Sequence, residues 1–238
     1  MKDPSKVKVM YEILGKPMIH YVVDLALELK MHRVIVVVGY QKEAVMEYLK
    51  TSQPSAECVV QDKQLGTGHA VMQARTVLES FQGHVIVLSG DVPLLTKESV
   101  NELIDHHLET GAKATILTAE MPDPSGYGRI IRDRDGTVKK VVEHRDATIE
   151  ELKVREINSG IYVFEKENLM EGLEHIKANN VQQEYYLTDI FEYFVKHQWK
   201  VAGLKVHHID EIRGINNFEQ LEEARKLMET RLSRRVLK

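Results

Sequence analysis

The stretch Val85-Ile86-Val87-Leu88-Ser89-Gly90-Asp91-Val92-Pro93 joins an unbroken apolar run to an immediate turn. An apolar run that does not alternate with polar residues is typical of a strand buried on both faces of a sheet. Asp91 then follows the carboxyl end of that strand, where open α/β sheets bind ligands. A carboxylate at this position suits Mg²⁺. The position fits a turn or helix-capping aspartate equally well, so these residues alone do not decide between the two.

Strand-like and helix-like segments alternate around this stretch. Residues 33–39 form a second continuous apolar run, and residues 16–30 before it carry apolar side chains at helical spacing. This alternation predicts an α/β fold of the Rossmann type, with a mixed, mostly parallel sheet flanked by helices. The other predicted helices cover residues 42–50, 68–80 and 97–110, and the other predicted strands cover residues 57–61 and 114–121.

The pattern changes after Pro122. Strands are predicted over residues 128–133, 138–143 and 157–164, with Asp135-Gly136 as a hairpin signal, which indicates an antiparallel patch. No linker or internal repeat divides the chain, so we expect one domain over residues 1–238. The remaining predicted elements are helices at 167–177 and 184–198, a strand at 200–206 and a C-terminal helix at 217–238.

The composition excludes several classes of protein. Lys and Arg total 32 against 36 Asp and Glu, a net charge of −4, so no nucleic-acid partner is expected. The apolar runs are too short to span a bilayer and no signal-peptide pattern opens the chain, which predicts a cytoplasmic protein without a membrane partner. Cys58, the one cysteine, excludes an intrachain disulfide and a multi-cysteine zinc site, and its valine neighbours indicate a buried, inert thiol.

A second candidate site lies between the strand at 57–61 and the helix after it. Gln61 and Gln64 each offer a hydrogen-bond donor and an acceptor, which complements an imide such as uracil. Gly66 and Gly68, on either side of Thr67, permit close approach of the backbone to a flat ligand. No Gly-Lys-Ser/Thr follows, so this is not a Walker loop. A structural connection before a helix is the commoner explanation for such glycines.

The antiparallel patch carries a third candidate group. Gly128, Glu143 and Asn158 lie at strand ends, where a carboxylate and an amide could hold sugar hydroxyls, although solvated hairpin ends explain them at least as well. The adjacent pair His106-His107 lacks the spacing of a helical metal site, and no catalytic triad is recognisable.

Taken together, nine short segments resemble one family in order and spacing. The chain resembles the uridylyltransferase domain of bacterial bifunctional N-acetylglucosamine-1-phosphate uridyltransferases/glucosamine-1-phosphate acetyltransferases, and single-domain sugar-1-phosphate nucleotidyltransferases are similar. Each motif is modest by itself, and their number in register makes the resemblance specific. The segments cover residues 6–10, 15–18, 64–70, 90–93, 126–129, 142–144, 157–160, 183–189 and 214–216.

The resemblance implies that UTP and N-acetyl-α-glucosamine 1-phosphate react to UDP-N-acetylglucosamine and pyrophosphate, for cell-wall precursor synthesis. It implies that Asp91 and Asn216 hold Mg²⁺ and that Lys8 meets phosphate, these three being the catalytic residues. The residues to which it assigns nucleotide binding are Lys8 at the phosphates and, around the uridine, Gln61, Gln64, Gly66 and Thr67. Those it places around the amino sugar are Gly128, Glu143, Asn158, Tyr186 and Thr188.

The chain also departs from the family. It starts where the family's first strand and glycine-rich phosphate loop should just have ended, so we expect the chain as written to be unstable or weakly active. Ser89 stands where relatives can carry tyrosine, which affects fine substrate contacts. No hexapeptide repeat follows, so acetyl transfer is not expected. The alternatives are a nucleotidyltransferase for another base or sugar, and a non-catalytic nucleotide-sugar-binding protein. The sequence does not indicate an oligomeric state.

Overall fold

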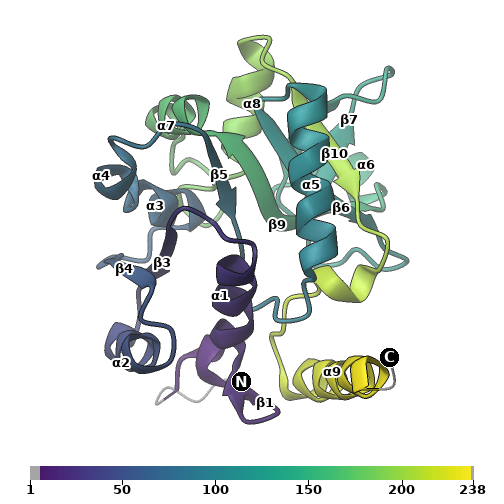
Figure 1. The fold of residues 1–238 in the computed structure, drawn as a ribbon. Helices are drawn as coiled ribbons and strands as arrows, with labels where there is room; N and C mark the ends of the chain where they lie inside the picture. The colour runs from purple at the N-terminus through teal and green to yellow at the C-terminus, as the bar shows by residue number, and fades with distance from the viewer. Residues whose placement is uncertain (1–5, 237–238) are drawn as a thin grey trace.

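The computed structural model describes residues 6–236, in which helices surround one large sheet and two small ones (Figure 1). The large sheet has six strands. Five of them follow one another in the order β10-β6-β9-β7-β8, and the sixth, β5, pairs with the C-terminal part of β9, beyond the residue that pairs with β7. Its strands are β5 (His84–Val87), β6 (Ala114–Glu120), β7 (Arg129–Arg132), β8 (Val138–Val142), β9 (Glu156–Glu165) and β10 (Val201–Lys205).

The ten-residue strand β9 organises this sheet. It runs antiparallel to β5, β6 and β7, while β10 runs parallel to β6. Its residues Ile161–Phe164 are buried between helices on both faces, as expected for a central strand. The predicted α/β class with a mixed sheet flanked by helices is therefore confirmed. The strand pairs in the large sheet are more often antiparallel than "mostly parallel" suggests, because β9 enters between β5 and β6 in the opposite direction.

A separate parallel pair, β3 (Val34–Val38) and β4 (Ala56–Val60), is connected by α2 (Lys42–Ser52). Among the strands within residues 6–236, β3 pairs only with β4, and β5 pairs only with β9. Leu88 packs against the core around β3 as well as against the core beneath α5 (Lys97–Thr110). The two groups of strands are thus joined by apolar side chains as well as by the chain itself.

The other helices cover the sheets and complete the core. α1 (Met18–Glu28) buries its apolar face against β3, and α7 (Lys166–His175) and α8 (Asp189–Lys196) pack against β9 through Leu169, Phe191 and Phe194. α9 (Phe218–Val236) lies against the hairpin that β1 (Glu12–Ile13) and β2 (Lys16–Pro17) form near the N-terminus (Figure 1). The short elements are η1 (Lys8–Met10), β1 (Glu12–Ile13), β2 (Lys16–Pro17), α3 (Thr67–Met72), α4 (Arg75–Leu78), α6 (Ile149–Leu152) and η2 (Ile209–Ile212).

Three predicted helices are shorter than expected. The helix predicted at 16–30 begins only at Met18, because Lys16–Pro17 pairs with β1 and proline lacks the N–H of a helix interior. The helix predicted at 68–80 is divided into α3 and α4. The helix predicted at 184–198 begins only at Asp189, because the residues before it bond to another segment. Residues 1–5 and 237–238, the ends of the expected domain and of its last helix, lie outside the described residues.

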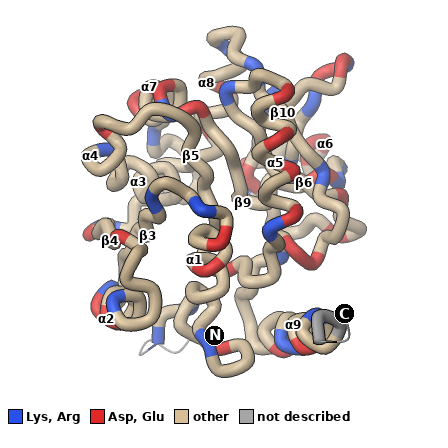
Figure 2. The backbone as a smooth tube through the Cα atoms, in the orientation of Figure 1, with Lys and Arg blue, Asp and Glu red and all other residues tan. Residues whose placement is uncertain are grey.

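Charged residues of both signs alternate along α2 and α9 (Figure 2). Cys58 is half-buried on β4, and burial raises the pKa of its thiol, which agrees with an inert cysteine. Across residues 6–236, no helix combines the length and apolar character needed to cross a membrane.

His107 on α5 is buried against the first residues of β5 and β6. Its Nδ1 lies 2.8 Å from Thr115 Oγ1 and its Nε2 lies 3.1 Å from His84 Nδ1. Burial, with a smaller effect of His84, lowers the pKa of His107 from 6.5 to about 4. The folded protein therefore holds a neutral imidazole over a pH range in which the unfolded chain takes up a proton.

We expect the burial of this imidazole to make the protein less stable as the pH is lowered. The stabilising contribution is present above pH 6.5 and is lost as pH falls from 6.5 to about 4. Linkage gives a loss of about 2 kcal/mol in the free energy of unfolding between pH 7 and pH 5. Urea unfolding at both pH values should show this difference in the wild type and less of it in His107→Gln. His208→Gln, at an exposed histidine, should behave like the wild type. An equal pH dependence in His107→Gln would contradict the prediction.

Candidate active site

The structure brings Lys8, Asp91 and Asn216 together from three separate parts of the chain. Lys8 lies in η1, Asp91 follows β5, and Asn216 lies between η2 and α9. Lys8 Nζ lies 2.5 Å from Asp91 Oδ2 and 2.8 Å from Asn216 Oδ1. Residues that are 83 and 208 positions apart thus form one polar centre at the carboxyl end of β5.

This centre has the chemistry of a cation site. The Lys8 ammonium stands between a carboxylate oxygen and an amide oxygen, both of which are ligand types for hard divalent cations. The part of the chain that the structure describes holds no cluster of three His, Cys, Asp or Glu suited to a metal. A cation here would therefore take its other ligands from phosphate oxygens and water, which is how Mg²⁺ is usually held beside nucleotides. Asp91 and Asn216 fit such an ion.

The loop after η2 fixes the amide of Asn216. Ile215 N donates to Asp91 O (3.0 Å), and Asn216 Nδ2 donates to Gly214 O (3.3 Å), which leaves Asn216 Oδ1 facing Lys8. Asn216 N donates to Gln220 Oε1 at 2.7 Å. The first turn of α9 thereby holds the loop that carries Asn216.

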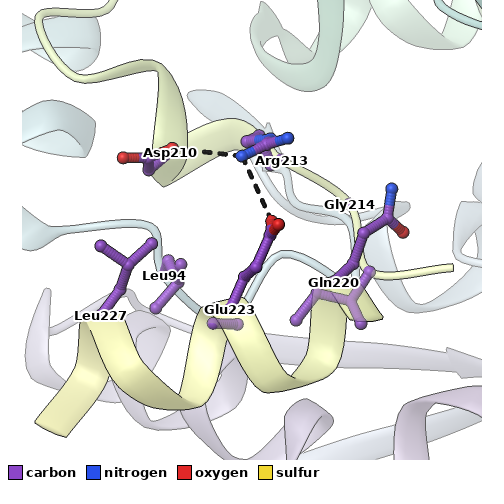
Figure 3. A pocket seen from close by; sticks show the side chains of 9 residues that line it. Leu94, Asp210, Arg213, Gly214, Gln220, Glu223 and Leu227 are labelled. Atoms are coloured by element: carbon purple, nitrogen blue, oxygen red, sulfur yellow. Dashed lines mark hydrogen bonds and ion pairs between the residues drawn. The ribbon is translucent and has the colours of Figure 1, made fainter. Parts of the chain in front are cut away.

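Figure 3 shows a crevice where α9 meets this loop. Arg213 reaches Asp210 at 3.5 Å and Glu223 at 3.6 Å across its mouth. The cavity is about 20 Å³, so it has room for a water molecule but not for a substrate. We therefore assign this crevice to the support of the Asn216 loop.

The Gln61 to Thr67 segment lies at the carboxyl ends of β3 and β4. Gln61 N donates to Val38 O at 2.7 Å, and Gln61 Nε2 donates to Gly66 O at 3.1 Å. Gln64 Nε2 donates to Gln61 O at 3.2 Å. Both glutamines predicted to read a base are thus held close together, with Gln61 buried and Gln64 exposed.

Residues 184–188 are tied to this segment by backbone hydrogen bonds. Tyr185 N donates to Leu65 O and Gly68 N to Tyr185 O, each at 2.8 Å, and Leu187 N donates to Thr67 Oγ1 at 3.1 Å. A Cβ atom on Gly66, where φ is +107°, would lie 2.6 Å from Tyr185 O. The sequence predicts that the glycines around Thr67 allow a ligand to approach the backbone closely. At Gly66 it is the backbone of Tyr185 that approaches closely.

Gly128, Glu143 and Asn158 of the antiparallel patch lie close together, and Thr188 lies beside Glu143. Asn158 N donates to Gly128 O (2.9 Å), and Thr188 Oγ1 donates to Glu143 Oε1 (2.9 Å). A Cβ atom on Gly128 would lie 3.4 Å from Glu143 Oε2 and 3.5 Å from Asn158 Cβ. These four residues, from four different segments, form one polar wall rich in hydrogen-bonding groups.

Tyr186 lies beside this wall with its hydroxyl buried. It is 8% exposed, and the carboxylate of Asp146 lies close to its buried hydroxyl. Burial, helped by Asp146 and Glu143, raises the pKa of Tyr186 to about 12. Burial also raises the pKa of Glu143. Partly desolvated carboxylates beside a buried hydroxyl suit a polyhydroxylated ligand.

Asp189 lies near the carboxylates of Glu143 and Asp146. It was not among the site residues predicted from the sequence. Burial, followed by repulsion from Glu143, raises its pKa from 3.8 to about 6. Its position in the Leu-Thr-Asp segment at the start of α8 is the only sequence signal for it. A raised carboxyl pKa means that ionised Asp189 destabilises the folded chain above pH 6, and that protonation at lower pH relieves this.

We therefore expect Asp189→Asn to be more stable than the wild type at pH 8. The expected gain in the free energy of unfolding is about 1–2 kcal/mol, and it should roughly halve at pH 5. Urea unfolding at both pH values measures it. Asp105→Asn, the same substitution at an exposed position on α5, should show no comparable gain. Equal stability of Asp189→Asn and wild type at pH 8 would contradict the prediction.

Comparison with known proteins decides the family of this chain. The family model for nucleotidyl transferases matches residues 5–208. The chain belongs to the nucleotidyl transferase family. The match covers the Lys8 and Asp91 corner, the glutamine segment and the antiparallel patch, so the family expected from the sequence is confirmed.

Curated relatives of this nucleotidyl transferase share its sequence over nearly its whole length. The bifunctional protein GlmU of Geobacillus sp. (strain WCH70) is 44% identical over 228 residues, covering 96% of this chain and 49% of the relative. The bifunctional protein GlmU of Exiguobacterium sibiricum is 46% identical over 224 residues, covering 94% and 49%. The chain thus spans about half the length of the curated relatives it matches.

Solved structures support the fold of this nucleotidyl transferase. UDP-glucose pyrophosphorylase complexed with UDP-glucose superposes with a TM-score of 0.70 at 19% identity, covering 94% of this chain and 90% of that one. HddC from Yersinia pseudotuberculosis, complexed with GMP-PN, gives a TM-score of 0.65 at 20% identity, covering 93% and 89%.

Proposed function

We propose that the chain transfers a uridylyl group from UTP to N-acetyl-α-glucosamine 1-phosphate, giving UDP-N-acetylglucosamine and pyrophosphate. The observation that carries the proposal is the joining of three groups. The base-reading segment and the hydroxyl-binding wall are both bonded to residues 184–188, through Tyr185 and Thr188. The cation centre is linked to the wall through Ser89, two residues before Asp91, which donates to Gly160 O (3.3 Å), two residues after Asn158. The relatives named bifunctional protein GlmU agree with the family resemblance of the sequence. We place the reaction in the cytoplasm, as a step that supplies cell-wall precursors.

The reaction needs no general base, because the attacking sugar-phosphate oxygen is already an anion at neutral pH. The protein has to align this oxygen with the α-phosphorus of UTP and to stabilise the negative charge of the departing pyrophosphate. Asp91 and Asn216 would hold Mg²⁺. The bound ion would neutralise charge on the phosphates of both substrates. Lys8, released from these two residues, would supply a positive charge to the phosphates.

The specificity groups follow from the same geometry. Gln61 and Gln64 offer amide groups for the edge of a uracil ring. Thr188 and Tyr186 offer hydroxyls, while Glu143 and Asn158 offer acceptors, for the hydroxyl and acetamido groups of the sugar. Gly66, Thr67 and Gly128 would bring backbone close to the ligands, within the limits that Tyr185 and Glu143 set.

A substrate panel tests the proposal. Four nucleoside triphosphates are combined with several sugar 1-phosphates in the presence of Mg²⁺, and pyrophosphate release is measured. We expect the fastest release with UTP and N-acetylglucosamine 1-phosphate, and none when a chelator removes the metal. Equal rates with dTTP and glucose 1-phosphate would instead indicate a nucleotidyltransferase for another base or sugar. Tight binding of UDP-N-acetylglucosamine without any Mg²⁺-dependent turnover would indicate a binding protein.

A further inference from the structure

His69 on α3 lies directly behind the amide of Gln61. The two side chains meet with His69 Nδ1 2.9 Å from Gln61 Nε2. The same Nε2 lies 3.1 Å from Gly66 O. Gln61 is only 8% exposed, so water can offer few hydrogen bonds to its amide if the amide turns another way.

These two contacts determine which way the Gln61 amide faces. A primary amide has two N–H groups, and the carbonyl oxygen of Gly66 can only accept one of them. The lone pair on His69 Nδ1 accepts the other. Rotation of the amide by half a turn would place Oε1 against Gly66 O, acceptor against acceptor. Oε1 is therefore the atom that remains for a ligand, and Gln61 acts as an acceptor.

The tautomer of His69 follows from the same contacts. A neutral imidazole carries one proton, so its two nitrogens cannot both accept. Gln73 Nε2 lies 3.3 Å from His69 Nε2, and it already donates to His69 O at 2.9 Å. We therefore assign the acceptor role to Nδ1, which makes the shorter contact with Gln61, and place the ring proton on Nε2. The 3.3 Å contact with Gln73 Nε2 is then not a hydrogen bond, and Gln73 is held by His69 O instead.

We propose that His69 is a positioning residue that fixes Gln61 as an acceptor and thereby makes the site select bases with a ring N–H. Uracil and thymine carry an imide N3–H, whereas cytosine carries a lone pair at N3. His69 therefore separates UTP from CTP but does not separate UTP from dTTP. This inference rests on the proposed function, in which Gln61 contacts the base.

Binding of UTP and of CTP to the full chain, without a sugar 1-phosphate, tests the inference by calorimetry. His69→Phe keeps a ring beside Tyr185, whose ring centroid lies 6.3 Å from that of His69, and removes the acceptor. It should lower the ratio of UTP to CTP affinity about tenfold, which corresponds to one hydrogen bond. His69→Asn, whose side-chain oxygen can replace Nδ1, should keep the ratio within about threefold of the wild type. His69→Leu serves in place of His69→Phe if that variant does not fold.

Gln73→Met is the matched control, since it removes the contact to the other ring nitrogen of His69 and should leave the ratio unchanged. An unchanged ratio in His69→Phe, a fall of equal size in Gln73→Met, or no rescue in His69→Asn would each overturn the proposal, as would a wild type that binds both nucleotides equally. Failure of the proposed function is seen separately, because absence of uridylyl transfer in the substrate panel does not alter the binding ratio.

Discussion

Replacing Asp91 with asparagine should lower kcat/KM for uridylyl transfer by a factor of about 10³, the range seen when a key electrostatic group is removed from an active site. The substitution keeps the shape of the side chain but removes the negative charge that faces Lys8 and would hold a metal. Affinity for Mn²⁺, measured by calorimetry without nucleotide, should fall about tenfold or more. The backbone carbonyl of Asp91, which accepts from Ile215, is unchanged, so the fold of the loop should persist.

The matched control for this variant is Asp210→Asn. Asp210 lies near the same loop and pairs with Arg213, but it does not contact Lys8 or Asn216. We expect its turnover and its Mn²⁺ affinity to remain close to those of the wild type. If Asp91→Asn kept its turnover, or if Asp210→Asn lost as much, Asp91 would not have the role proposed for it.

Replacing Lys8 with methionine should change metal affinity and turnover in opposite directions. The ammonium of Lys8 lies between Asp91 and Asn216, where a metal would bind. Without this competing cation, Mn²⁺ should bind to the nucleotide-free chain about tenfold more tightly. Turnover should nevertheless fall about 10²-fold, because the positive charge that would stabilise the departing pyrophosphate is lost.

Lys6→Met provides the control for Lys8→Met. Lys6 carries the same charge two residues earlier and lies over the ring of Tyr11, 5.0 Å from its centroid. Its loss should change neither metal affinity nor turnover by more than about twofold. Weaker Mn²⁺ binding in Lys8→Met would mean that Lys8 does not compete for the metal position. Unchanged turnover would mean that its charge does not act on the phosphates.

The sequence predicted the site only where local patterns carry the information. Asp91 was found because an apolar run ends beside it, and strand ends are where α/β sheets bind ligands. Lys8 and Asn216 have no such local signal, since they reach Asp91 only through the folded chain. The family resemblance alone identified them. The roles assigned to these residues and to the glutamines remain predictions that the variants above test.

Residues 184–188 show why some local structure was not predictable. Their spacing predicts the first turn of a helix, but backbone bonds from Tyr185 to Leu65 and Gly68 keep this stretch out of the helix, and Leu187 and Thr188 form a turn before α8 begins. A contact between segments so distant in the sequence leaves no mark on helical periodicity. His69 was missed for a related reason. Spacing along the sequence indicates metal-binding histidines, whereas His69 contacts the side chain of Gln61, which no spacing pattern marks.

The long separation between Lys8 and Asn216 has a consequence for the order in which the protein matures. A chain emerging from the ribosome presents Lys8 and Asp91 early, but 208 residues separate Lys8 from Asn216. Gln220, which anchors Asn216, emerges later still. Strands and helices of the N-terminal part can form while synthesis continues. The cation centre cannot, so catalytic competence has to wait until Asn216 and Gln220 have been made and have folded against Lys8 and Asp91.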